Sequence, residues 1–296
     1  LPWEDYIGKY DAFPVNGRSI DSALFSIPDC QSIVKKAIVE RLKQKYHISH
    51  FEETGAEYRV RFFIYKNVAS LMIDTSGEGL HKRGYRRKSN DAPLKETLGA
   101  AMCDLARIYP DTLMFDPFCG SGTLLIEAAL KATNTAPGLR RFFSAERFGF
   151  IPDNIWREER MRAQDLIVHN IEFRAQGFDI DPNAVALTNE NAEKAGMKKY
   201  VKASVGDVRD FTVPDERCLV ITNPPYGERL LDVKAAEELY AVMGQRFREG
   251  CGRKYYIISP HDEFERFFGR EADKRRKLYN GMIKCQLFMY FKNRER

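Results

Sequence analysis

The feature that most limits the fold is the alternation of strands and helices after residue 110. Short apolar runs predict strands at residues 112–116, 176–180, 200–205, 218–222 and 254–259. Helical patterns at residues 123–131, 182–195 and 234–249 fall between them, and the proline at position 182 opens one of these helices. Strands joined through helices pair in parallel, with the helices covering the sheet. We therefore predict an α/β fold with a Rossmann-like domain built on a mostly parallel sheet.

The N-terminal part of the chain has a different pattern. Residues 26–46 read as a helix that Ser26 can cap, with Pro28 in its first turn. Residues 58–64 alternate apolar and polar, and residues 68–73 follow closely enough to form a hairpin. The basic stretch at residues 81–88 then marks a junction. We predict a small α/β domain over residues 1–79 and a larger one over residues 80–296.

Two further expectations concern the ends of the chain. Residues 277–291 predict an antiparallel hairpin that turns at Asn280–Gly281. The first residue is Leu1 and not Met, so we expect an upstream part to be missing from the small domain.

Composition excludes several classes of protein. No apolar run is long enough to cross a bilayer and no signal-peptide pattern opens the chain. Scattered single cysteines suit a reducing cytosol, so we expect a cytoplasmic protein. The six cysteines form no CxxC pair and only five histidines accompany them, so we expect no metal site. The net charge of +5 is compatible with a nucleic-acid partner but does not establish one.

A Gly-rich turn, Asp116-Pro-Phe-Cys-Gly-Ser-Gly-Thr123, joins the first strand of the larger domain to a helix. Glycines let a ligand approach the backbone, and the amides that open the helix suit a carboxylate or a phosphate. The turn is not GxGxxG and has no P-loop lysine, which disfavours a nicotinamide cofactor and ATP. Taken alone, the turn is also compatible with a structural corner.

Acidic residues follow the next two strands. Asp179 lies where the strand at residues 176–180 ends, and a carboxylate there can accept hydrogen bonds from both hydroxyls of a ribose. Asp181 precedes Pro182 and fits the cap of the next helix. Asp207 follows the strand at residues 200–205 and can accept from an adenine amino group, although a turn role is favoured for it alone.

The most specific motif is Asn223-Pro-Pro-Tyr226, which follows the apolar strand at residues 218–222. The two prolines take the backbone out of the sheet and leave the Pro224 carbonyl free as an acceptor. The Asn223 side-chain oxygen is a second acceptor. Two acceptors aimed at one NH2 group can orient its nitrogen, while Tyr226 offers a ring on which a base can stack.

Together these motifs resemble those of the class I amino-methyltransferases. Within that group, Leu80-His-Lys-Arg-Gly-Tyr-Arg86 and Ala92-Pro-Leu-Lys-Glu96 resemble the THUMP-domain RNA methyltransferases. That family includes enzymes that make N2-methylguanosine in 23S rRNA and in tRNA, and its members are often labelled adenine-specific DNA methylases. The resemblance covers essentially the whole chain, with residues 1–76 similar to a THUMP domain. Cys119 replaces a glycine found in many class I enzymes but suits this subfamily.

The resemblance implies S-adenosyl-L-methionine as the cofactor and a role for each motif. The Gly-rich turn would line the methionine end of the cofactor. Asp179 would bind its ribose, Ile180 would pack on its adenine, and Asp207 would bind the adenine amino group. The positions implied for the cofactor are Ala92, Pro93, Asp116, Phe118, Gly120, Gly122, Asp179, Ile180, Asp207 and Asn223. Those implied for the target base are Asn223, Pro224, Pro225 and Tyr226.

The expected function is methylation of an exocyclic base amine, with guanine N2 in 23S rRNA as the first substrate and RNA as the partner. A DNA adenine-N6 methylase and a tRNA guanine-N2 methylase are the alternatives, because the same motif suits either amine. An RNA-binding protein without activity is a further alternative, which the complete set of motifs opposes. The basic stretches at residues 81–88 and 274–277 suit either phosphate contacts or a solvated charged surface. The oligomeric state is left open.

Overall fold

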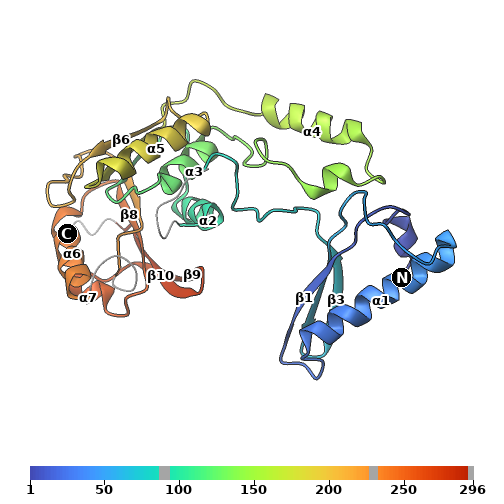
Figure 1. The fold of residues 1–296 in the computed structure, drawn as a ribbon. Coiled ribbons are helices and arrows are strands. Elements are labelled where there is room, and N and C mark those ends of the chain that lie inside the picture. The colour runs from blue at the N-terminus through green and yellow to red at the C-terminus, as the bar shows by residue number, and fades with distance from the viewer. Residues whose placement is uncertain (87–93, 227–232, 293–296) are drawn as a thin grey trace. The chain divides into compact units, whose positions relative to one another are not determined.

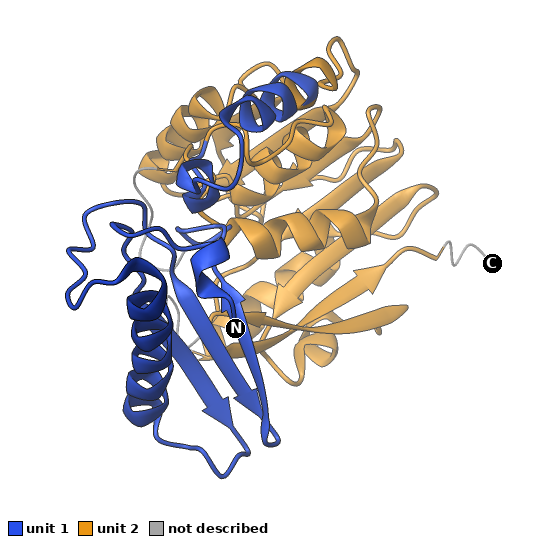
Figure 2. Cartoon of the chain, turned by 90° about the vertical axis from the view of Figure 1, so that its right-hand side faces the viewer, with its two compact units in different colours: residues 1–80, 141–162 blue, residues 81–140, 163–296 orange. Residues whose placement is uncertain are grey.

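The computed structural model describes residues 1–86, 94–226 and 233–292. These residues form two compact units, one of residues 1–80 and 141–162 and the other of residues 81–140 and 163–296 (Figure 2). The sequence patterns had placed residues 141–162 in the larger domain, whereas the structure groups them with the smaller unit.

The smaller unit is a three-stranded sheet with one long helix. Its elements are η1 (Trp3–Asp5), β1 (Val15–Ile20), α1 (Ile27–Tyr46), β2 (Val60–Tyr65) and β3 (Val68–Ile73). Strand β1 pairs in parallel with β2, and β2 pairs antiparallel with β3, which is the expected hairpin. The buried residues Ile38 and Leu42 of α1 share a hydrophobic cluster with Val60, Phe62 and Ile64 of β2. The alternation seen in the sequence of β2 is therefore the alternation of its buried and exposed faces.

The segment of residues 141–162 completes this hydrophobic cluster. The Phe148 ring stacks on the Tyr58 ring with 4.3 Å between ring centroids, and the Gly149 amide donates to the Tyr58 hydroxyl at 2.8 Å. Arg141 donates to the carbonyls of Ser76, Glu78 and Gly79. Helix α4 (Asp153–Asp165) begins in the same segment. A truncation at residue 80 would therefore cut through a packed core and expose Phe148.

The larger unit contains a seven-stranded sheet with the order β6-β5-β4-β7-β8-β10-β9. All neighbours from β6 to β8 pair in parallel, while β10 runs antiparallel to β8 and β9. The strands are β4 (Leu113–Asp116), β5 (Arg174–Asp179), β6 (Val201–Val205), β7 (Cys218–Thr222), β8 (Arg253–Ser259), β9 (Lys274–Asn280) and β10 (Ile283–Tyr290).

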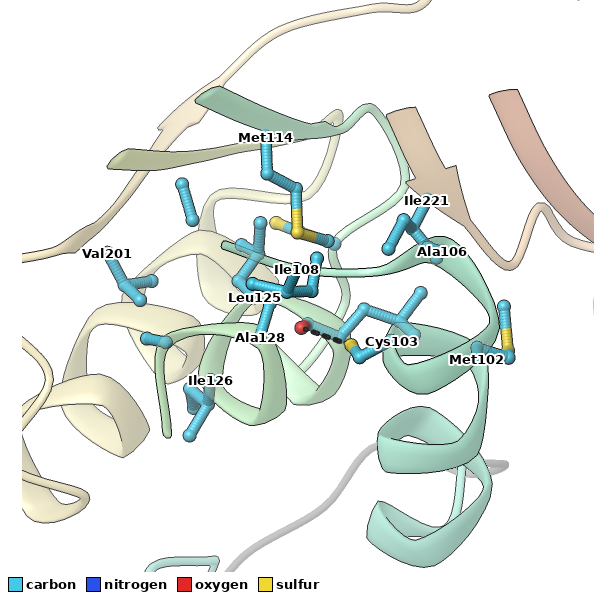
Figure 3. Close-up of a cluster of buried hydrophobic side chains, with 14 of the residues drawn as sticks. Met102, Cys103, Ala106, Ile108, Met114, Leu125, Ile126, Ala128, Val201 and Ile221 are labelled. Carbon is cyan, nitrogen blue, oxygen red and sulfur yellow. Dashed lines mark hydrogen bonds between the residues drawn. The ribbon is translucent and has the colours of Figure 1, made fainter. Parts of the chain in front are cut away.

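Helices cover both faces of this sheet (Figure 1). Buried residues of α2 (Glu96–Ala106), α3 (Thr123–Ala132) and α5 (Pro182–Lys194) join one hydrophobic cluster with the sheet. Figure 3 shows part of it, including Met102 and Cys103 of α2, Leu125 of α3 and Met114 of β4. A second cluster joins α6 (Val233–Arg246) and α7 (Phe264–Phe268) to the sheet, through Tyr240, Phe264 and Phe288 among others. The predicted α/β class and mostly parallel sheet are confirmed.

Some elements differ from the sequence expectation. Strand β1 and helices α2, α4 and α7 were not predicted. The C-terminal hairpin is present, but Asn280 pairs with Ile283, so the turn is formed by Gly281 and Met282. Gly281 has a φ of 68°, which glycine adopts readily. Across residues 1–86, 94–226 and 233–292, no helix combines the length and apolar character that a membrane span requires.

Candidate active site

The predicted motifs meet at one pocket of about 740 Å³ in the larger unit. It opens at the carboxyl ends of β4, β5, β6 and β7, where the chain order of the sheet reverses between β4 and β7. Ligands of open parallel sheets bind at such a position. The lining residues that the sequence had singled out are Asp116, Phe118, Gly120, Asp179, Ile180, Asp207, Asn223, Pro224, Pro225 and Tyr226.

The Gly-rich turn is held in shape by neighbours from β5 and α5. The Cys119 amide donates to the Phe178 carbonyl at 2.9 Å, and the Thr188 hydroxyl donates to the Gly120 carbonyl at 2.8 Å. Gly122 does not line the pocket; it is buried with a φ of 81°, and a Cβ there would lie 2.8 Å from a Thr188 methyl. Gly122 therefore serves the backbone of the turn, whereas Gly120 faces the cavity.

Asp179 links the Gly-rich turn to the end of β5. Its two carboxylate oxygens each accept one backbone amide, from Gly120 and from Asp181, both at 3.0 Å. Each oxygen retains acceptor capacity, so the carboxylate is oriented and can still receive a ligand hydroxyl. Asp181 instead accepts from the Asn183 amide at 2.8 Å and caps α5. The distinction drawn between the two acids agrees with this geometry.

Asp116 is a buried carboxyl that lines the pocket. Its Oδ1 accepts from the Thr222 hydroxyl at 2.7 Å and from the Phe118 amide at 3.1 Å. Burial raises the pKa of Asp116 to about 7, since removal from water disfavours the charged form more than these two hydrogen bonds favour it. Thr222 precedes Asn223, so this hydrogen bond also ties the Gly-rich turn to the Asn-Pro-Pro-Tyr motif.

The raised pKa of Asp116 leads to a pH-dependent prediction. If the ionised carboxylate faces the cationic methionine end of the cofactor, binding requires loss of its proton. Affinity for S-adenosylmethionine should then be level above pH 7 and fall about tenfold per pH unit below it. Calorimetry across this range tests the slope, with Asp116→Asn as the control whose affinity should not follow pH. Equal slopes in both proteins would contradict the assignment.

The adenine end of the expected cofactor site is more exposed. Ile180 has 71 % of its surface accessible, although it lines the pocket, so an apolar face is available to a ring. Asp207 accepts from the Arg209 amide at 2.8 Å and pairs with the Arg209 guanidinium. These contacts lower the pKa of Asp207, which stays an ionised acceptor. Its turn role and a ligand role are compatible, because the carboxylate has further lone pairs.

Asn223 carries an unsatisfied acceptor. Its Oδ1 is buried, and it has no hydrogen-bond partner within the described ranges of the chain. A buried acceptor without a partner costs about 1–3 kcal/mol. Because Asn223 lines the pocket, a ligand NH2 group would remove this cost.

Tyr226 is anchored by a residue that sequence reasoning missed. Its hydroxyl accepts from the Asn280 side-chain amide at 2.9 Å, and both residues are buried. Asn280 ends β9, 54 residues further along the chain. From the sequence, Asn280 was expected only as a turn residue. The one feature that could have indicated its contact with Tyr226 is its position at the end of a strand.

The Asn280 contact gives a stability prediction. Tyr226→Phe keeps the ring but leaves the buried Asn280 amide without this acceptor, which should cost about 1–3 kcal/mol. The melting temperature should fall by about 2–4 °C per kcal/mol. In Tyr226→Phe/Asn280→Leu both polar groups are absent, so the double variant should regain much of the loss. A double variant no more stable than Tyr226→Phe would argue against this hydrogen bond as the cause.

The basic stretch at the junction is partly buried in ion pairs. Arg83 pairs with Glu127 at 3.4 Å, and Arg86 pairs with Glu96 at 2.7 Å. Arg86 also donates to the carbonyl of Leu94, a residue that lines the pocket. Arg86 therefore supports the pocket wall at Leu94, and each of the two guanidinium groups already has a carboxylate partner. Ala92 and Pro93, expected beside the methionine end, lie outside the described residues.

Comparison with known proteins agrees with this geometry. Residues 83–288 match the family model described as an RMKL-like methyltransferase domain, and residues 1–74 match that of the THUMP domain. The chain belongs to the RMKL-like methyltransferase family. The resemblance to the THUMP-domain RNA methyltransferases is thereby confirmed.

Individual relatives are similar over nearly the whole chain. The Bacillus subtilis protein YpsC, named provisionally as an RNA methyltransferase, is 43 % identical over 98 % of this chain and 76 % of its own length. The ribosomal RNA large subunit methyltransferase K/L of Shewanella pealeana is 37 % identical, and the chain spans only 42 % of its length. The solved structure of SMU.472, provisionally described as a methyltransferase and in complex with S-adenosylhomocysteine, is 38 % identical with a TM-score of 0.92, over all of this chain and 79 % of that one.

These findings bear on the chemistry of the pocket. S-adenosylhomocysteine is the product that S-adenosylmethionine leaves after it gives up its methyl group. The family and this structural relative make the chain an S-adenosylmethionine-dependent methyltransferase, as the motifs had implied.

Proposed function

We propose that this enzyme methylates the N2 amine of a guanine in large-subunit ribosomal RNA. The observation that carries the proposal is the buried Oδ1 of Asn223, which has no partner among the described residues and lies in the same pocket as the Gly-rich turn. An NH2 group placed against this oxygen and the Pro224 carbonyl satisfies both acceptors. Its nitrogen then faces the part of the pocket where we place the cofactor.

The reaction requires positioning more than activation. The sulfonium methyl of the cofactor is already electrophilic, so the protein needs to align nitrogen, methyl and sulfur in line. The acceptors at positions 223 and 224 also stabilise positive charge that develops on the attacking amine. After transfer, the amine loses a proton, for which water is a sufficient acceptor. The target base must leave its stack to reach the pocket, and the Tyr226 ring gives it a surface on which to stack.

The cofactor roles follow the lining of the pocket. We assign the methionine end to Asp116, Phe118 and Gly120, the ribose to Asp179, and the adenine to Ile180 and Asp207. Each of these residues lines the same cavity as Asn223, which supports a cofactor that delivers its methyl toward the base motif.

Guanine is favoured over adenine by a carboxylate at the pocket. Glu238 of α6 lines the cavity and is exposed. Guanine carries an N1–H donor next to its N2 amine, whereas adenine has an acceptor at N1. A flipped base is read along its Watson–Crick edge. A carboxylate that accepts a hydrogen bond from N1–H at this edge would therefore select guanine.

The accompanying THUMP domain and the names of the relatives favour RNA as the substrate. The THUMP match covers residues 1–74, and curated relatives carry RNA methyltransferase names. We assign RNA docking to the smaller unit, because the methyltransferase motifs all lie in the larger one. A solved relative from Listeria monocytogenes, 42 % identical with a TM-score of 0.91 over 98 % of this chain and 76 % of that one, is described as a predicted N6-adenine-specific DNA methylase, which makes adenine the alternative to test.

The deciding experiment is transfer of a labelled methyl group to unmodified large-subunit rRNA, tRNA and duplex DNA, followed by mass spectrometry of the nucleosides. N2-methylguanosine formed on the rRNA is the expected product. N6-methyladenine formed on DNA would establish the alternative. N2-methylguanosine formed only on tRNA would keep the proposed reaction but change the substrate from rRNA to tRNA.

A further inference from the structure

The β9–β10 hairpin reaches the same edge of the sheet as the pocket. Strand β9 runs antiparallel to β10, and β10 runs antiparallel to β8, so β9 points in the same direction as β7 and β8. The carboxyl end of β9 is Asn280, and Asn280 donates to Tyr226 of the base motif. The Gly281–Met282 turn therefore lies next to the place where we expect the target base.

One face of this hairpin carries exposed cationic and aromatic side chains. Tyr279 pairs with Lys284 in the strand register, and Lys277 lies two residues before Tyr279, so the three share a face. All three are exposed, with 55 % of the Tyr279 surface accessible, and the Lys277 ammonium lies 5.3 Å from the Tyr279 ring centroid. Within residues 1–86, 94–226 and 233–292, neither lysine forms an ion pair, whereas Arg275 on the same strand pairs with Glu265.

We propose that this face of the β9–β10 hairpin binds the RNA strand that flanks the target base. Lys277 and Lys284 contact phosphates, and Tyr279 stacks on a neighbouring base. The inference rests on the proposed function, since it places the hairpin beside a base held by Asn223 and Tyr226. Two lysines that form no ion pair with any described residue lie next to an exposed ring. Proteins bind single strands through such a combination of backbone charge and base stacking.

A second explanation for these lysines exists. Strand β9 ends the sheet, and lysine on an edge strand discourages pairing with another chain. That role does not need Tyr279 and has no effect on RNA affinity. The two explanations therefore separate in a binding measurement.

The test compares the unaltered protein with Lys277→Ala/Lys284→Ala, using a short fluorescent single-stranded RNA of mixed sequence at several salt concentrations. The control is Lys199→Ala/Lys202→Ala, which removes the same charge from the opposite edge of the sheet, at the start of β6. Loss of two phosphate contacts should lower affinity about ten- to thirtyfold at 0.1 M salt and reduce the salt slope by about 1.4. The control should bind as the wild type does.

Tyr279 provides an uncharged arm of the test. Tyr279→Ala should lower RNA affinity by roughly fivefold or more, while Tyr279→Phe, which keeps a ring, should stay near the wild type. Affinity for S-adenosylmethionine should not change in any variant, which reports that the larger unit remains folded.

The test distinguishes a failure of the hairpin assignment from a failure of the proposed function. Wild-type affinity and salt slope in the double lysine variant, with unchanged cofactor binding, would overturn the hairpin assignment even if the enzyme methylates RNA. Loss of RNA affinity in that variant, together with a wild-type enzyme that transfers no methyl group to RNA, would retain the hairpin as an RNA contact and reject the proposed reaction.

Discussion

Replacing Asn223 by alanine is expected to lower the single-turnover rate of methyl transfer by about a hundredfold or more. Its Oδ1 is buried at the pocket without a described partner, so this oxygen is available to orient the target amine. Without it, the amine can rotate and its nitrogen no longer lies in line with the methyl group. The rate should fall far more than the affinity for the cofactor.

Two controls separate this role from a structural one. Asn223→Asp retains an acceptor oxygen and should keep more activity than Asn223→Ala. The melting temperature should not fall in Asn223→Ala, because that variant removes an unsatisfied buried atom. If rate, cofactor affinity and melting temperature all declined in parallel, Asn223 would only shape the loop.

Replacing Asp179 by alanine should weaken S-adenosylmethionine binding by roughly ten- to a hundredfold, equivalent to about 1.5–3 kcal/mol for a hydrogen bond to a charged acceptor. The carboxylate is held by the amides of Gly120 and Asp181, which orients it toward the pocket before any ligand arrives. Removing it loses both the ribose acceptor and the hydrogen bond that restrains the Gly-rich turn.

Calorimetry on two variants distinguishes the two contributions. Asp179→Asn keeps one oxygen as an acceptor for a backbone amide but removes the charge, so its affinity should lie between those of the wild type and Asp179→Ala. Asp181→Ala is the matched control, because Asp181 caps α5 with Asn183, and it should lower stability without a comparable loss of affinity. Wild-type affinity in Asp179→Ala would reject the ribose assignment.

The motifs could be recognised in the sequence because each depends on interactions between residues that are close together in the chain. The Gly-rich turn needs glycine at a φ of 81° at position 122, and Asp181 caps the helix that Pro182 opens. The apolar run at residues 218–222 is buried along its whole length, so it had to be an inner strand, and the two prolines after it had to leave the sheet. Since the carboxyl ends of parallel strands share one edge, the order of motifs was enough to predict one site.

What the sequence by itself determined is therefore the α/β class, the position of each ligand motif at a strand end, and the family. Only the tertiary structure decided which distant residues support them. Asn280 reaches Tyr226 across 54 residues, and Phe148 packs on Tyr58 across a gap of 90 residues. The sequence left Arg83 and Arg86 open between phosphate contacts and a solvated surface, whereas in the structure they pair with Glu127 and Glu96. No short-range pattern encodes such contacts, because they depend on how separate elements pack and which charges that packing removes from water.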